Sequence, residues 1–199
     1  MALNAYARAL TDRVVDPVAR GLVRVGATAD TLTAAGLIIT AAAAAVVIVV
    51  DQRLGALVLA LGSVLDAFDG AVARLRGTSS TFGAFYDSVA DRVSDAIILG
   101  TAAWLVRDEP VLFGVAMVAL GGAQVTSYIR AKAESLGWNA TVGVLERAER
   151  VIVVVLGLAL DLLPLALWVL AIGALVTIVQ RWVAVRRQAL ATGSGRAAR

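Results

Sequence analysis

The sequence predicts an all-α, polytopic membrane protein with six transmembrane helices and an N-terminal juxtamembrane amphipathic helix. Of its 199 residues, 60% are hydrophobic and 17% are charged, and the mean hydropathy is +0.84. A soluble domain is roughly half apolar and about a quarter charged. The apolar residues lie in long runs at 32–50, 54–65, 111–125 and 151–160, and the breaks between the runs are short and polar.

Residues 2–18 are predicted to form the amphipathic helix. Leu10, Val14, Val18 and Leu22 recur at helical spacing and therefore fall on one face. The segment lacks the charged start and the small-residue cleavage site of a signal peptide. We expect it to lie on the membrane surface and to lead into the first span.

The six spans are expected near residues 31–50, 54–75, 83–104, 110–131, 150–164 and 165–186, within one membrane domain over residues 1–190. Residues 191–199 are expected to be a disordered tail. Of the 18 Lys and Arg residues, only Arg53 and Arg107 then fall on outer loops. Because cytoplasmic loops carry the excess of positive charge, both termini are expected in the cytoplasm.

Cysteine and histidine are both absent from the sequence. A disulfide framework, a zinc finger, a thiol nucleophile and an imidazole base are therefore excluded. Any bound metal must take oxygen ligands, which favours magnesium, manganese or calcium. Proton transfer must rely on carboxylates, tyrosine, lysine or water.

Five aspartates fall within the second and third predicted spans. They are Asp66, Asp69, Asp87, Asp91 and Asp95. Each carboxylate costs about 2.5–3.5 kcal/mol to insert at a helix centre, so five on two helices need a cause. One interpretation is that they lie at solvated helix ends and pair with Arg74, Arg76 and Arg92.

The spacing of the aspartates favours a metal site instead. Asp66 and Asp69 are three residues apart, and Asp87 and Asp91 are four apart, so each pair shares a helix face. A short turn joins the two helices, which lets the pairs converge. Four convergent carboxylates repel one another unless cations neutralise them, and two divalent ions would also bind a pyrophosphate. Asp95 lies one turn deeper and is interpreted as structural.

The aspartates belong to a longer pattern. Residues 66–74 read DAFDGAVAR and are followed by Gly83, Asp87 and Asp91. All eight fixed positions of the signature D-x2-D-G-x2-A-R-x8-G-x3-D-x3-D match, and in this stretch the chain resembles the CDP-alcohol phosphotransferase family. The resemblance implies six helices in a homodimer and a CDP-linked substrate that loses CMP.

The same resemblance implies roles for individual residues. Asp66, Asp69 and Asp87 would bind metal, and Asp91 would both contact metal and act as the base. Residues expected to bind the CDP-linked lipid are Asp30, Thr33, Gly70, Ala73, Arg74 and Ser80. Two alternatives stay open: Asp30 would be a helix cap, and Ser80, with Thr81, would only form a turn.

Cationic residues at the inner ends of the last three spans indicate an acceptor that carries its own phosphate. Arg130, Arg150 and Arg181, with Ser127, would surround one anionic pocket, because the guanidinium fork suits phosphate. Alternatively these arginines are only positive-inside anchors.

Residues 127–134 and 145–150 resemble the phosphatidylinositol phosphate synthases of actinobacteria, a branch of the same family in which lysine is common at the position of Arg130. The resemblance implies transfer from CDP-diacylglycerol to inositol 1-phosphate at a bacterial cell membrane, with Mg²⁺ or Mn²⁺. The alternatives are transfer to glycerol 3-phosphate, as in a phosphatidylglycerophosphate synthase, and a membrane transporter.

Overall fold

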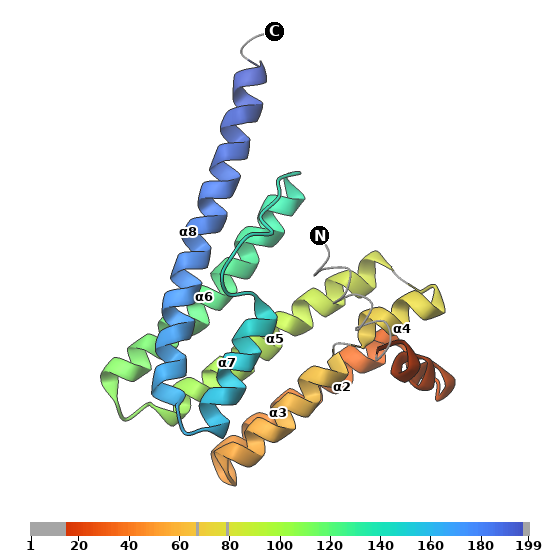
Figure 1. Ribbon diagram of the computed structural model, residues 1–199, viewed down its shortest axis with the longest axis vertical. Coiled ribbons are helices and arrows are strands. Elements are labelled where there is room, and N and C mark those ends of the chain that lie inside the picture. The colour runs from red at the N-terminus through yellow and green to blue at the C-terminus, as the bar shows by residue number, and fades with distance from the viewer. Residues whose placement is uncertain (1–14, 67, 79, 197–199) are drawn as a thin grey trace, which may run out of the picture.

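The computed structural model describes residues 15–66, 68–78 and 80–196, with side chains described to residue 191. All regular structure within these ranges is helical (Figure 1). The elements are α2 (Ala29–Val49), α3 (Gln52–Asp66), α4 (Asp69–Arg76), α5 (Thr81–Leu105), α6 (Pro110–Ser135), α7 (Arg147–Ala159) and α8 (Leu163–Arg196). Residues 15–24 are also helical, whereas most of the predicted surface helix, residues 2–14, lies outside the described ranges.

Four helical segments in the described ranges are long and apolar enough to cross a membrane. They are Ala29–Val49, Gln52–Arg76 (α3 and α4 together), Pro110–Ser135 and Leu163–Ala191. The third predicted span corresponds to α5, which is 25 residues long but carries Asp87, Asp91, Arg92 and Asp95. The fifth corresponds to α7, whose 13 residues rise roughly 20 Å against a hydrocarbon core of about 30 Å.

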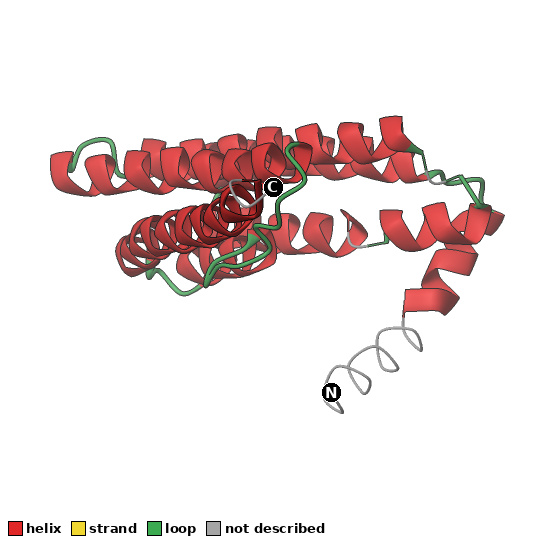
Figure 2. Ribbon diagram, turned by 90° about the horizontal axis from the view of Figure 1, so that it is seen from above, coloured by secondary structure: helices red, strands yellow, loops and turns green. Residues whose placement is uncertain are grey.

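The helices form a bundle in which α5 lies between two groups. α2 packs against α3 and α5, while α6 packs against α5 and α8, and α7 bridges α3 and α8. Figure 1 shows that the α2–α3, α5–α6 and α7–α8 turns lie toward one end of the bundle, and Figure 2 shows that helices and loops, with no strand, make up the described part of the chain. The start of α2, the α3–α4 junction and the start of α5 lie toward the other end (Figure 1).

Small residues allow close helix contacts inside the bundle. A Cβ atom on Gly55 of α3 would lie 2.8 Å from the backbone nitrogen of Val47 in α2. Close approach of this kind is typical of helix packing in membranes, where small residues favour van der Waals contact. Large apolar side chains such as Leu57 and Leu61 of α3 are exposed on the outside of the bundle. The outer surface therefore suits lipid.

The predicted second span is interrupted at the aspartates. α3 ends at Asp66 and α4 begins at Asp69, with Phe68 in a turn, so these aspartates do not share one continuous helix face. The apolar pattern alone predicts an unbroken helix, but Asp and Gly are poor helix formers and Gly70 follows directly. The break gives α4 an N-terminus of its own at the site.

The last helix continues beyond the predicted start of the disordered tail. α8 extends to Arg196, where disorder was expected from residue 191 onward. Ala189, Leu190 and Ala191 are strong helix formers and propagate the helix. The expected break before α8 is present, because α7 ends at Ala159 and α8 begins at Leu163.

Asp161 ties the α7–α8 turn to the start of α3. It has a positive φ of 58° and accepts hydrogen bonds from Gln52 and Arg53. The Arg53 hydrogen bond lowers the pKa of the Asp161 carboxyl below its ordinary value. This contact fixes the end of the bundle opposite Asp66, because α3 begins at Gln52 and ends at Asp66.

The helix at residues 15–24 supports α4. Ala19 is fully buried with Leu32 of α2 and with Ala71 and Val72 of α4. Arg76, in the last turn of α4, donates a hydrogen bond of 3.4 Å to the Val23 carbonyl. This small cluster holds α4 against α2, the only long helix that α4 contacts extensively in the described part of the chain.

Candidate active site

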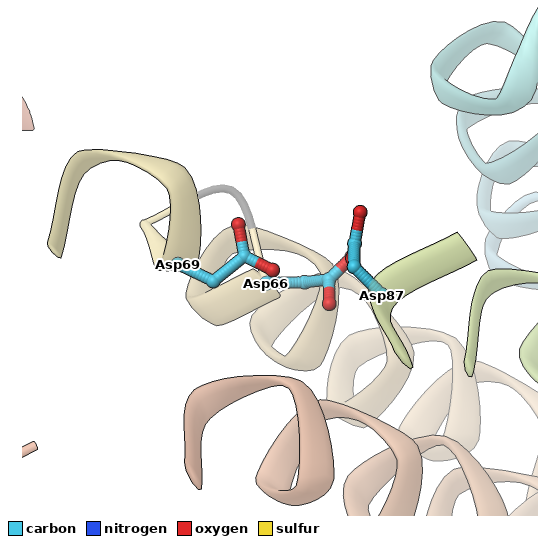
Figure 3. A group of neighbouring side chains, drawn as sticks. All are labelled: Asp66, Asp69 and Asp87. Carbon is cyan, nitrogen blue, oxygen red and sulfur yellow. The ribbon is translucent and has the colours of Figure 1, made fainter. Parts of the chain in front are cut away.

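Three aspartates converge between α3, α4 and α5. Asp66 is the last residue of α3, Asp69 is the first of α4, and Asp87 lies in the second turn of α5. One carboxylate oxygen from each lies within 4.8 Å of the other two, and all three residues are partly exposed. Figure 3 shows the three carboxyl groups gathered in one place.

Neighbouring residues hold the carboxylates in position. Thr33 of α2 is buried and donates a hydrogen bond of 3.2 Å to Asp69 Oδ2, while the Gly70 backbone N–H donates to Asp69 Oδ1. Gly36 of α2 leaves room for Asp66, since a Cβ atom at Gly36 would lie 3.2 Å from Asp66 Oδ1.

The aspartate trio fits a divalent metal ion. Three carboxylates this close repel one another strongly in a poorly solvated site. Hard cations such as Mg²⁺ and Mn²⁺ take such oxygen ligands, and the chain has no histidine or cysteine to offer a softer set. The trio can therefore bind a metal, and a cation would remove the repulsion.

Asp91, the fourth aspartate of the signature, pairs with two arginines. Arg147 Nη1 lies 2.9 Å from Asp91 Oδ1 and 2.6 Å from Asp66 Oδ2, and Arg92 lies 3.3 Å from Asp91 Oδ2. Asp91 is one helical turn beyond Asp87, roughly 6 Å along α5. The structure thus brings Asp91 beside the trio but not into it.

A cavity of about 440 Å³ opens beside Asp69 and Asp87 and is ringed by three helix N-termini. These are the starts of α2, α4 and α5. Free backbone N–H groups and the helix dipoles favour anions at such ends. All six residues predicted to bind the CDP-linked lipid line this cavity: Asp30, Thr33, Gly70, Ala73, Arg74 and Ser80.

The helix caps beside this cavity test the alternative roles of Asp30 and Ser80. Thr28, not Asp30, caps α2, in a capping box with Thr31, so the cap interpretation of Asp30 is wrong. The reason is that α2 begins at Ala29, ahead of the apolar run. Ser80 does cap α5, since its Oγ accepts a hydrogen bond of 2.9 Å from the Gly83 N–H. It also lines the cavity, so the two roles of Ser80 are compatible.

A second cavity, of about 390 Å³, has Asp91 in its wall. The side chains predicted to bind the acceptor phosphate line it together: Ser127, Arg130, Arg150 and Arg181. Arg147 and Asp91 line it as well. Arginines from α6, α7 and α8 therefore meet at one cavity, although they are up to 51 positions apart in the sequence (181 minus 130).

These arginines also have structural partners. Arg150 is 5% exposed and its Nη2 lies 2.5 Å from Asp95 Oδ2. Arg181 is 4% exposed and donates to the Thr126 carbonyl at 2.7 Å and to the Val142 carbonyl at 2.9 Å. Arg130, which is partly exposed, pairs with Glu134 at 3.0 Å.

Sequence reasoning missed several residues of the site. The pattern of charges in the sequence predicted no contact of Arg147 with either Asp66 or Asp91. The signal was its position three residues before Arg150, on the same face of a helix that begins there. Thr28 and Thr78 also line the larger cavity and carry no motif that distinguishes them from turn residues.

The structure has membrane-spanning helices, a carboxylate trio that could bind a metal, and a cavity between three helix N-termini. This combination is typical of a membrane-embedded transferase that handles a phosphate-linked substrate. The family model for CDP-alcohol phosphatidyltransferases matches residues 27–180. The chain belongs to this family, and it is an enzyme of the CDP-alcohol phosphatidyltransferase type.

Curated relatives cover nearly the whole chain. The phosphatidylinositol phosphate synthase of Streptomyces avermitilis is 39% identical over 98% of this chain and 87% of its own length. The enzyme of the same name from Mycolicibacterium smegmatis is 35% identical over 92% of this chain and 89% of its own. The resemblance to the actinobacterial branch is thereby confirmed.

Solved structures share the fold. The crystal structure of Mycobacterium tuberculosis phosphatidylinositol phosphate synthase with CDP-DAG bound has a TM-score of 0.81 and 34% identity, over 87% of this chain and 94% of that one. The same protein in complex with manganese and citrate has a TM-score of 0.76 and 33% identity, over 86% of this chain and 88% of that one. The chain is thus a multi-pass membrane protein.

Proposed function

We propose that this chain is a phosphatidylinositol phosphate synthase, which transfers the diacylglycerol-phosphate group of CDP-diacylglycerol to inositol 1-phosphate and releases CMP. One observation carries the proposal. α5 presents Asp87 to the cavity ringed by helix N-termini and Asp91, one turn later, to the cavity lined by arginines. A donor pyrophosphate and an acceptor hydroxyl would thus meet across one helical turn.

The larger cavity is the proposed donor site. The N-termini of α2, α4 and α5 supply backbone donors for phosphate oxygens, and Arg74 adds a positive charge. Gly70 and Ala73 keep this wall small, so that the nucleotide approaches the α4 backbone. Asp30 and Ser80 offer polar contacts to the cytidine and ribose. A related enzyme holding CDP-DAG supports this choice of donor.

The aspartate trio is the proposed metal site, with Mg²⁺ or Mn²⁺ as the ion. Asp66, Asp69 and Asp87 would hold one ion, and a second would share these carboxylates with Asp91. When bound, such ions neutralise the pyrophosphate and stabilise the charge that develops on departing CMP. The related enzyme that contains manganese supports a divalent cofactor.

The smaller cavity is the proposed acceptor site. Arg130, Arg150 and Arg181, with Ser127, would bind the phosphate of inositol 1-phosphate and aim its free hydroxyl at the donor. Asp91 would accept the hydroxyl proton. The hydroxyl oxygen then forms a bond to the lipid-attached β-phosphorus, and the bond from that phosphorus to the bridging oxygen breaks, so that CMP leaves with the electron pair.

The depth of the site suits a lipid donor. With Gln52 at the outer boundary of the bilayer, Asp66 would lie roughly 21 Å deeper along α3, within a hydrocarbon core of about 30 Å. The diacylglycerol tails would therefore stay in the bilayer during transfer. For the whole chain we propose six membrane spans, two of which are α5, which carries charges, and α7, which is short. Both termini and the site would lie on the cytoplasmic side. The protein would be a homodimer in a bacterial cell membrane.

An acceptor competition tests the proposal. Purified protein in lipid bilayers would receive CDP-diacylglycerol and Mg²⁺ with inositol 1-phosphate, glycerol 3-phosphate or free inositol, and the lipid products would be identified by mass. Phosphatidylinositol phosphate should form much faster than the other two products. Preferential formation of phosphatidylglycerophosphate would overturn the acceptor assignment and leave the donor chemistry intact.

A further inference from the structure

We infer that Asp95 is a positioning residue for acceptor binding, which acts by fixing the guanidinium of Arg150. The inference rests on the proposed function, because it takes the cavity lined by arginines to be the acceptor site. The aspartate signature ends at Asp91, and the sequence interpretation treated Asp95 as structural.

Asp95 and Arg150 form an ion pair that is almost completely buried. Asp95 lies on α5 and is 3% exposed, and Arg150 lies on α7 and is 5% exposed. Their side chains meet at 2.5 Å, between Oδ2 of Asp95 and Nη2 of Arg150. Outside water, a charged guanidinium depends strongly on such a partner. Asp95 therefore determines where the Arg150 guanidinium rests.

Only one member of the pair reaches the acceptor cavity. Arg150 lines the cavity of about 390 Å³, and Asp95 is not among its lining residues. Asp95 instead borders a space of about 10 Å³ with Ser94 and Arg147. Any effect of Asp95 on the acceptor must therefore pass through a neighbouring side chain.

Asp95 leaves most of the donors of Arg150 unused. A guanidinium carries five N–H donors, and Asp95 accepts a hydrogen bond from Nη2. The Nε is buried and has no hydrogen-bond partner among the described residues, so it is not the atom that meets the cavity. The guanidinium that lines the cavity is thus held at one edge by Asp95, which preorganises it for an anion.

The other arginines of the cavity also have fixed partners in the protein. Arg130, Arg147 and Arg181 line the same cavity as Arg150, together with the carboxylates of Asp91, Glu134, Glu146 and Glu149. Arg147 is held by Asp66 and Asp91, and Arg181 by the Thr126 and Val142 carbonyls. Asp95 does the same for Arg150, so the cluster stays in place before the acceptor arrives.

The test uses Asp95→Asn, which keeps the side-chain volume and one oxygen acceptor but removes the charge. The expected result is a KM for inositol 1-phosphate raised about tenfold, with the KM for CDP-diacylglycerol unchanged and kcat near wild type at saturating acceptor. Asp161→Asn is the matched control. It breaks the ion pair with Arg53 at the other end of the bundle and should change neither KM.

A double-mutant cycle with Arg150→Ala separates positioning from a general structural role. If Asp95 acts through Arg150, the double variant should have the same acceptor KM as Arg150→Ala alone. Asp95→Glu is a second variant for the case in which Asp95→Asn does not fold because the charge is lost. It keeps the buried arginine neutralised but shifts the carboxylate by one methylene, and it should raise the acceptor KM several-fold.

Three results would overturn the inference. The first is an unchanged KM for inositol 1-phosphate in both Asp95 variants. The second is an equal change in the KM for inositol 1-phosphate and the KM for CDP-diacylglycerol. The third is a double variant whose fold-change in the KM for inositol 1-phosphate is the product of the fold-changes of Asp95→Asn and Arg150→Ala. The proposed function would survive each of them, provided that wild type still makes phosphatidylinositol phosphate. Failure of the wild type to use inositol 1-phosphate would overturn the proposed function itself, and the inference with it.

Discussion

Nη1 of Arg147 lies 2.6 Å from Oδ2 of Asp66, so a cation of the protein's own contacts one member of the metal-binding trio. The same atom lies 2.9 Å from Asp91, which joins the proposed metal site to the proposed base. A divalent ion bound at Asp66 would be repelled by the Arg147 guanidinium unless that side chain moved away.

Arg147→Gln should therefore bind Mn²⁺ more tightly than wild type, by roughly three- to tenfold, because a competing charge has been removed. Titration calorimetry of the purified protein without substrates measures this affinity. Arg92→Gln is the control, since Asp91, at 3.3 Å, is the only carboxylate that Arg92 pairs with in the described part of the chain, and it should have a smaller effect. Weaker Mn²⁺ binding by Arg147→Gln would mean that Arg147 orients the carboxylates.

Asp66→Asn and Asp87→Asn should each abolish turnover while the protein remains folded in detergent. Each change removes one of three carboxylates that hold the ion, and it also relieves repulsion in the metal-free protein. CMP release and thermal unfolding measure the two properties. Residual activity above about a tenth of wild type, a change of barely ~1.4 kcal/mol, would contradict the shared site.

Arg150→Ala should raise the KM for inositol 1-phosphate by about ten- to a hundredfold, because a charged contact worth roughly 1.5–3 kcal/mol is lost. The KM for CDP-diacylglycerol should not change. Arg107→Ala is the control, since Arg107 lies in the α5–α6 turn against Trp104. A positive-inside anchor would instead change expression or insertion and leave the kinetics unaltered. Arg150→Ala and Arg181→Ala should both also lower stability, because the first leaves Asp95 buried without its partner and the second removes two hydrogen bonds to backbone carbonyls.

Gly36→Ala should weaken Mn²⁺ binding and lower turnover. The new methyl group would lie 3.2 Å from Asp66 Oδ1 and would push this carboxylate away from the trio. Gly121→Ala in α6 is the matched control, since its Cβ meets nothing within 4 Å. Alanine gains up to about 1 kcal/mol over glycine in a helix, so Gly121→Ala should gain stability without loss of metal affinity. Equal metal affinity in the two variants would show that Asp66 has room to move.

Much of the site could be predicted from the sequence, because its strongest signals are local. Asp66, Asp69, Gly70, Ala73 and Arg74 fall within nine residues, and their spacing is specific enough to identify the family. The charges at the inner helix ends likewise predicted a cavity lined by arginines. Side chains that share a short motif or a helix face need no tertiary information to be grouped.

The rest depends on tertiary contacts and on local competition between helix and turn. The pairs Arg147–Asp66 and Arg150–Asp95 join residues 81 and 55 positions apart, so no periodicity indicates them. The break between α3 and α4 lies within an apolar pattern that predicts one helix, and poor local propensity wins there. The predicted end of α8 was too early, because the Gly- and Ser-containing composition after residue 191 was interpreted as disorder.

The most direct test is the fate of an isotopic label in one reaction. Inositol 1-phosphate carrying ¹⁸O at its reacting hydroxyl would be incubated with CDP-diacylglycerol, Mg²⁺ and the purified protein in bilayers, and both products would be weighed by mass spectrometry. The account predicts labelled phosphatidylinositol phosphate and unlabelled CMP, and neither product when EDTA replaces Mg²⁺. Label in CMP, an unlabelled lipid product, or full activity in EDTA would contradict metal-dependent displacement at the lipid-attached phosphorus.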